Sequence, residues 1–127
     1  YPGVLNLIFH LNACKIPLAI CSGALREDIA PILARLGIAD CFDIIVTADD
    51  VAASKPDPEC YQLAFQRLHS SRHQSFSKDA TMAIEDTPAG ITAAKAAGLM
   101  VCAVTNSYPA ARLDQATFVT ESLSLLL

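Results

Sequence analysis

The sequence lacks several features that would assign it to other classes of protein. It has no apolar run near the roughly 18–20 residues that a membrane helix needs, and no positively charged leader that would mark a signal peptide. Its net charge is −4, with acidic and basic residues interspersed, so it presents no basic surface for nucleic acid or an anionic membrane. We therefore expect a cytoplasmic protein whose partners include neither nucleic acid nor a membrane.

The sequence also lacks a CxxC pair, although it contains five cysteines. Most of them lie in apolar stretches, which is typical of reduced, buried thiols in a cytosolic protein rather than of disulfides or metal ligands. The five are Cys14, Cys21, Cys41, Cys60 and Cys102.

What the sequence does have is a high apolar content, 53% of 127 residues, arranged in alternating helical and strand patterns. We predict helices over Val4–Ala13, Arg26–Leu36, Asp57 to about Leu68, and Thr87–Gly98, and strands over Ile16–Cys21, Phe42–Thr47, Thr81–Ile84, Met100–Thr105 and Thr117–Val119. The polar stretch Ser70–Asp79 is expected to be an exposed loop. Alternation of this kind predicts a single α/β domain over residues 1–127, Rossmann-like, with a largely parallel sheet.

Two carboxylates, Glu85 and Asp86, stand at the end of one predicted strand. Thr87 and Pro88 follow as the N-cap and first residue of a helix. Acids at the end of a buried strand are costly unless something neutralises them, and ligand sites in open α/β sheets lie at this edge. The pair therefore predicts a hard-cation site, although acids favoured by the dipole of the next helix are the alternative.

Ser22 and Gly23 end the strand that begins at Ile16. A hydroxyl beside a glycine whose amide a ligand can approach suits a phosphoryl oxygen. The alternative is an ordinary cap for the helix that begins at Arg26, because Ser-Gly is a common turn dipeptide.

Lys55 lies in the loop after the next strand, where Pro56 and Pro58 stiffen the backbone. An ammonium fixed there could neutralise a phosphoryl dianion. The alternative is a solvated loop lysine. Asp49 and Asp50 could pair with Lys55, but we expect them to face water.

The order of these three strand ends resembles the haloacid dehalogenase superfamily, in particular its β-phosphoglucomutase-like phosphatases. Cys21–Arg26 is similar to the second motif of that family, Ser54–Pro58 to the third, and Ile84–Gly90 to the fourth. The opening Tyr1-Pro2-Gly3 resembles the point where the family re-enters its core after a cap domain, and the matching elements run to about Leu125. The resemblance implies a three-layer sandwich of the Rossmann-like type.

The resemblance also implies roles for particular residues. Ser22, with Gly23, would bind the transferring phosphoryl group and Lys55 would steady it. Asp86 would be a direct Mg²⁺ ligand, with Glu85 beside it as a second ligand or a water-mediated partner.

One element of the family pattern is absent from the 127 residues. The first motif of the family is a strand that ends in Asp-x-Asp and supplies the nucleophile and the general acid/base, and no Asp-x-Asp occurs here. The resemblance places that strand centrally, between the strands that end at Ser22 and Glu85, so we expect an incomplete sheet with a gap there. We expect the chain to be the C-terminal part of a longer protein, or a sequence whose N-terminal portion is missing, and to be inactive alone.

The function implied by the resemblance is Mg²⁺-dependent phosphatase or phosphotransferase activity on small phosphate esters such as sugar phosphates, through an aspartyl-phosphate. The alternative is a catalytically inactive remnant that serves as a binding or interaction module. A receiver-like signalling domain also has clustered acids and a lysine, but not in this order.

Overall fold

The computed structural model describes residues 3–71 and 76–126. Tyr1 and Pro2 of the opening motif, and residues 72–75 of the expected loop, lie outside them. The helices are α1 (Val4–Ala13), α2 (Arg26–Leu36), α3 (Glu59–Ser71) and α4 (Pro88–Ala96), and the strands are β1 (Ala19–Cys21), β2 (Ile44–Val46), β3 (Met82–Glu85), β4 (Met100–Val104) and β5 (Phe118–Thr120). The predicted order of elements is confirmed, and no helix among the described residues is both long and apolar enough to cross a membrane.

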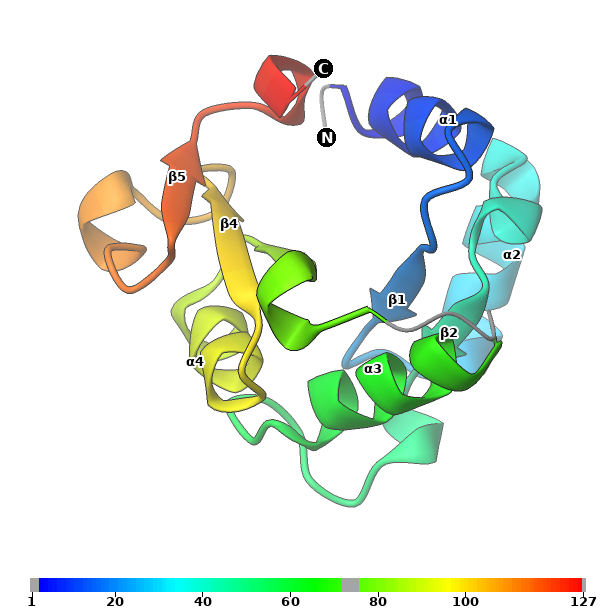
Figure 1. The fold of residues 1–127 in the computed structure, drawn as a ribbon, viewed down its shortest axis with the longest axis horizontal. Helices are drawn as coiled ribbons and strands as arrows, with labels where there is room; N and C mark the ends of the chain where they lie inside the picture. Colours follow the sequence, from blue (N-terminus) through cyan, green and yellow to red (C-terminus); the bar gives the residue numbers. More distant parts are fainter. Residues whose placement is uncertain (1–2, 72–75, 127) are drawn as a thin grey trace.

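The strands form two parallel sheets (Figure 1). β1 pairs with β2 in one sheet, and β4 pairs with β3 and β5 in the other. Within the described residues no ladder joins β1 to β3, which confirms the predicted gap between the strands that end at Ser22 and Glu85. The fold is α/β and Rossmann-like, as expected.

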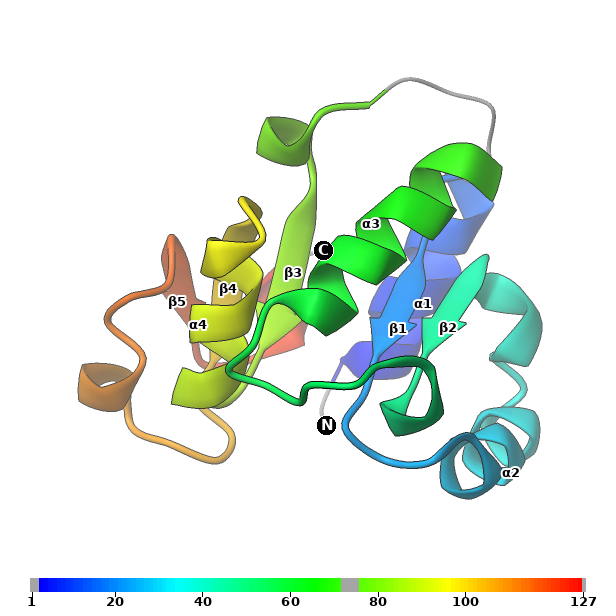
Figure 2. The ribbon, with the colours of Figure 1, turned by 90° about the horizontal axis from the view of Figure 1, so that it is seen from below.

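Helices cover both faces of the strands. Figures 1 and 2 show α3 and α4 on one face and α1 on the other, with the C-terminal turn Leu123–Leu126 beside α1. Leu7 of α1 forms a small core with Val104 and Leu123 on that side. The first helix and the C-terminal turn of the described chain therefore pack against each other on this face.

Helix α3 connects the two sheets through the main hydrophobic core. Its residues Cys60 and Ala64 belong to the same buried cluster as Val46 of β2 and Ala83 of β3. Burial of each large apolar side chain contributes about 1.5–3 kcal/mol, so this shared core holds the sheets together without backbone pairing between them. Alanines on α4, among them Ala93 and Ala94, let that helix pack closely on β3 and β4.

The helix boundaries follow the predicted signals. The Thr87 side chain accepts a hydrogen bond from the Gly90 amide at 3.0 Å, and Pro88 begins α4. Gly37 ends α2 in the left-handed region, where a residue without Cβ is favoured. Two expectations need correction. Helix α3 continues through Ser70 to Ser71, into the predicted loop, and Cys14 is exposed.

The expectation that Asp49 and Asp50 face water is incomplete, because Asp49 is exposed and Asp50 is half-buried, but both also accept hydrogen bonds within the protein. The Thr47 amide donates to Asp50 Oδ2 at 2.8 Å and Arg26 Nη2 donates to the same oxygen at 3.0 Å. Asp49 Oδ2 accepts from the Arg26 amide at 2.8 Å. Both carboxylates therefore bind the start of α2 to the end of β2. The sequence could not show the connection to α2, because Arg26 lies more than twenty residues before both carboxylates.

Asp50→Ala tests this connection. The backbone hydrogen bond from Thr47 lowers the pKa of Asp50 below its ordinary value of 3.8, so the stabilisation is present above that value and is lost as pH falls through the lower folded pKa. We expect Asp50→Ala to lower the free energy of unfolding by about 1 kcal/mol at pH 7. The difference from the unsubstituted protein should shrink below pH 3.8. Urea unfolding across pH measures both, with Asp114→Ala as the control, and an equal loss at all pH values would contradict the assignment.

Candidate active site

Three predicted site segments meet where β1 and β3 end. Lys55 lies in the loop between β2 and α3, and its ammonium reaches the last residue of each strand. Nζ donates to the Cys21 carbonyl at 3.1 Å and to Glu85 Oε2 at 2.7 Å. Lys55 therefore bridges the two sheets at their carboxyl edge, and it is not the solvated loop lysine of the alternative interpretation.

The loop that carries Lys55 is itself held in place. The Glu59 carboxylate accepts hydrogen bonds from the amides of Ala52 and Ala53, at 3.1 and 3.0 Å. The Lys55–Pro56 peptide bond is cis. Because Glu59 begins α3, the loop closes onto the first turn of that helix.

Glu85 is buried, with 7% of its surface exposed. Its Oε2 accepts hydrogen bonds from Lys55 Nζ and from the Tyr61 hydroxyl. Burial, and then the Glu85 charge, raise the pKa of Tyr61, so the phenol stays protonated and acts as the donor. On the other side Gly90 leaves no room for a Cβ, which would overlap the carboxylate. Glu85 is thus enclosed by groups that fix its position.

Asp86, the next residue, is less buried than Glu85. It follows β3 directly, is half-buried, and its Oδ2 accepts a hydrogen bond from the Ser107 hydroxyl at 2.8 Å. Glu85 is therefore enclosed, whereas Asp86 stays partly exposed beyond the end of β3.

The structure therefore brings one accessible carboxylate to the predicted metal site. Within residues 3–71 and 76–126, no cluster of three or more His, Cys, Asp and Glu side chains is arranged to hold a metal ion. Magnesium is commonly bound by one or two carboxylates, several waters and a substrate phosphate. Asp86 fits that pattern as a ligand, whereas the Glu85 oxygen that faces Lys55 already has two donors.

The Ser22–Gly23 turn lies at the end of β1. The Ser22 amide donates to the Val46 carbonyl at 2.9 Å, and its hydroxyl accepts from the Ala24 amide at 3.1 Å. The hydroxyl therefore shapes its own turn, while the N-cap position of α2 is Leu25, without a side-chain cap. Space beside Gly23 is open, with no atom within 4 Å of where a Cβ would stand. A ligand can approach this backbone.

Cys21, next to Ser22, is not suited to nucleophilic chemistry. Burial, followed by the nearby Cys60, raises the pKa of the Cys21 thiol to about 12. Since the thiolate is the reactive form, this cysteine stays inert at neutral pH.

Sequence reasoning missed Tyr61 and Glu59, and assigned no role to Ser107. An aromatic residue in the first turn of a helix is typical of a core position, so its hydroxyl carried no signal of a partner at Glu85. Glu59 sits where an acid is favoured by the helix dipole alone. The only feature of the sequence that could have pointed to Glu59 and Tyr61 as site residues is that both follow Lys55 closely along the chain.

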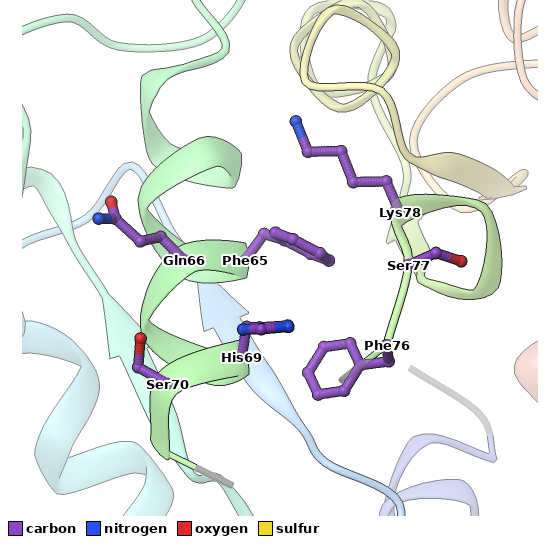
Figure 3. A pocket seen from close by; sticks show the side chains of 7 residues that line it. All are labelled: Phe65, Gln66, His69, Ser70, Phe76, Ser77 and Lys78. Carbon is purple, nitrogen blue, oxygen red and sulfur yellow. The ribbon is translucent and has the colours of Figure 1, made fainter. Parts of the chain in front are cut away.

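A separate open hollow of about 430 Å³ lies at the opposite edge, beside the end of α3 and the segment before β3 (Figure 3). Phe65 and Phe76 meet edge to face at 5.8 Å between centroids, and Lys78 Nζ lies 5.7 Å from the Phe65 ring. The lining residues are Phe65, Gln66, His69, Ser70, Phe76, Ser77 and Lys78. They include no carboxylate, and the rings fasten α3 to the approach to β3.

Comparison with known proteins shows the family of the chain. Residues 1–98 match the family described as haloacid dehalogenase-like hydrolase. The chain belongs to that family. Its similarity to relatives extends beyond the matched region, to nearly the whole chain.

Two curated relatives of this haloacid dehalogenase-like chain are named as phosphatases. The validoxylamine A 7'-phosphate phosphatase of Streptomyces hygroscopicus subsp. limoneus is 33% identical over 96% of the chain and 54% of the relative. Hexitol phosphatase A of Escherichia coli (strain K12) is 32% identical over 96% of the chain and 53% of the relative. The chain thus spans about half the length of these relatives.

Solved structures of the same family share the fold. The β-phosphoglucomutase of Clostridium difficile superposes with a TM-score of 0.82 at 28% identity, covering 99% of this chain and 52% of that one. CbbY from Rhodobacter sphaeroides, solved in complex with xylulose-(1,5)bisphosphate, gives a TM-score of 0.79 at 27% identity, covering 97% and 54%. The β-phosphoglucomutase-like character expected from the motifs is confirmed.

Gly90→Ala tests the enclosure of Glu85. In an ordinary helix, alanine is more favourable than glycine by up to about 1 kcal/mol. Here the new Cβ would overlap the Glu85 carboxylate, so we expect a loss of about 1–3 kcal/mol in the free energy of unfolding. Gly23→Ala, where no atom lies near the added carbon, is the matched control. A stabilised Gly90→Ala variant in urea unfolding would show that Glu85 is free to move.

Proposed function

We propose that this chain forms the phosphate- and metal-binding part of a Mg²⁺-dependent phosphatase or phosphotransferase that acts on small phosphate esters such as sugar phosphates. The observation that carries the proposal is the Lys55 ammonium, fixed by Cys21 and Glu85 at the edge where the Ser22 and Asp86 loops begin. The names of the relatives support the substrate class: a validoxylamine A 7'-phosphate phosphatase, a hexitol phosphatase, and a phosphorylated carbohydrates phosphatase of Thermotoga maritima.

In this proposal each residue has a distinct task. The Ser22 hydroxyl and the Gly23 amide bind phosphoryl oxygens, and Lys55 places one positive charge beside them. Asp86 holds Mg²⁺ directly, with Glu85 behind it. The bound metal would withdraw charge from the phosphoryl oxygens.

The attacking group in the proposal is an aspartate on a further strand that pairs with β1 and β3. Its carboxylate oxygen forms a bond to phosphorus while the ester P–O bond breaks, and a general acid protonates the leaving alcohol. Water then hydrolyses the aspartyl-phosphate, or a sugar hydroxyl takes the phosphoryl group in a mutase. The absence of β1–β3 pairing within the described residues supports this position, as does the exposure of Met82 and Ile84 on β3, at 46% and 41%.

A second candidate function is a non-catalytic binding module, and one observation favours it. The 127 residues contain no Asp-x-Asp. In that case phosphate binding at Lys55 and Ser22 would occur without turnover in any form of the protein.

The decisive experiment supplies the attacking strand. The part of E. coli hexitol phosphatase A that this chain does not span is fused before Tyr1, and hydrolysis of p-nitrophenyl phosphate and hexose phosphates is measured with and without Mg²⁺. We expect Mg²⁺-dependent turnover by the fusion and none by the 127-residue chain. A folded fusion that binds phosphate without turnover would favour the binding module.

Substitutions in the active fusion then test the assigned residues. Asp86→Asn and Lys55→Ala should each lower kcat about 100-fold or more, because each removes a charge aimed at the phosphoryl group. Asp79→Asn and Lys95→Ala, exposed and outside the candidate site, are the matched controls and should retain activity. Full turnover in both Asp86→Asn and Lys55→Ala would refute the proposed function.

A further inference from the structure

Tyr61 contacts both members of the Lys55–Glu85 ion pair. Its hydroxyl donates to Glu85 Oε2, the same oxygen that accepts from Lys55 Nζ at 2.7 Å. Its ring lies beneath the ammonium, with 5.0 Å between Nζ and the ring centroid. Such cation–π contacts are attractive, and more so when they are shielded from water.

The Tyr61 side chain is itself rigidly placed. It is 7% exposed and packs in the main core beside Val46 and Ala64. It stands in the first turn of α3, two residues after Glu59, whose carboxylate closes the Lys55 loop. The same helical turn therefore fixes both the backbone and the charged end of Lys55.

The donors of Lys55 show what this placement achieves. An ammonium has three N–H donors, and within the described residues Cys21 and Glu85 take two of them. One donor is left for a ligand. A free lysine side chain loses about 2 kcal/mol of rotamer entropy when it is fixed, so groups that fix it in advance favour ligand binding.

We propose that Tyr61 is a positioning residue: its hydroxyl fixes the Glu85 carboxylate and its ring supports the Lys55 ammonium, so that the remaining N–H of Lys55 points to the phosphoryl oxygen. This role rests on the proposed function for its ligand, but the geometry of Lys55 itself does not depend on that function. A purely structural Tyr61 would fill the core and leave the Lys55 ammonium unaffected when the hydroxyl is removed.

The test uses Tyr61→Phe, which removes the hydroxyl and keeps the ring, in the 127-residue chain. The readouts are the ¹⁵N signal of Lys55 Nζ in lysine-labelled protein, the affinity for inorganic phosphate with Mg²⁺, and thermal stability. We expect the Lys55 signal to shift and the dissociation constant for phosphate to rise about 3- to 10-fold, since a tenfold change corresponds to about 1.4 kcal/mol. Tyr61→Leu, which also removes the ring, should weaken phosphate binding further.

Leu68→Ala is the matched control, because Leu68 is buried on the same helix and its truncation lowers stability through packing alone. It should leave the Lys55 signal and the phosphate affinity unchanged. An unchanged Lys55 signal in folded Tyr61→Phe would overturn the proposal. If the unsubstituted chain binds no phosphate, the proposed function fails, while the Lys55 signal still decides the positioning role.

A second measurement leaves Tyr61 in place and covers the case in which Tyr61→Phe does not fold. The chain is labelled with 3-fluorotyrosine, and the ¹⁹F signal of Tyr61 is compared between the unsubstituted protein and Lys55→Met. The proposal expects this signal to move when the ammonium above the ring and the partner of Glu85 are removed. A Tyr61 signal that stays in place would overturn the proposal.

Discussion

The structure depends on one buried carboxylate. Glu85 ends β3, and its Oε2 is shared by Lys55, from the loop after β2, and Tyr61, from α3. An isolated charge at 7% exposure would be costly, so the carboxylate requires these donors and draws their elements together. Since no backbone ladder joins β1 to β3 in the described residues, this cluster is the polar link between the two sheets.

The same link explains local features that otherwise look unrelated. Gly90 has no side chain because the Glu85 carboxylate occupies the space, although glycine is unfavourable within a helix. Glu59 ties the Lys55 loop to α3 and so limits the loop's freedom. A charged group held by fixed dipoles and partners needs no reorganisation when a ligand arrives. The contacts that stabilise this part of the fold are therefore the same contacts that hold Lys55 in position for a ligand.

Much of this could be predicted from the sequence, because helix signals are local. Thr87 with Pro88 marks the start of α4, and Gly37 the end of α2. The alternation of helices and strands, with polar residues at three strand ends, predicted that Lys55 lies at the carboxyl edge of the sheet, where β1 and β3 end. The burial of Glu85 beside a half-buried Asp86 was not predicted, because two adjacent acids give no local sign of which one is enclosed. Tyr61 was missed because a hydroxyl partner 24 residues away leaves no local pattern.

Within the described residues, β1 and β3 each pair with a strand on one side alone, and this affects how the candidate site is assembled. Ser22 comes from the β1–β2 sheet and Asp86 from the β3–β4–β5 sheet, with Lys55 spanning the two. One strand between two neighbours fills about two strand spacings, roughly 9–10 Å. A parallel strand placed there would bring its own carboxyl end between Ser22 and Asp86, beside the Lys55 ammonium. If the proposed function holds, Ser22, Lys55 and Asp86 would thus surround the place of the attacking aspartate, because that aspartate would end the strand between β1 and β3.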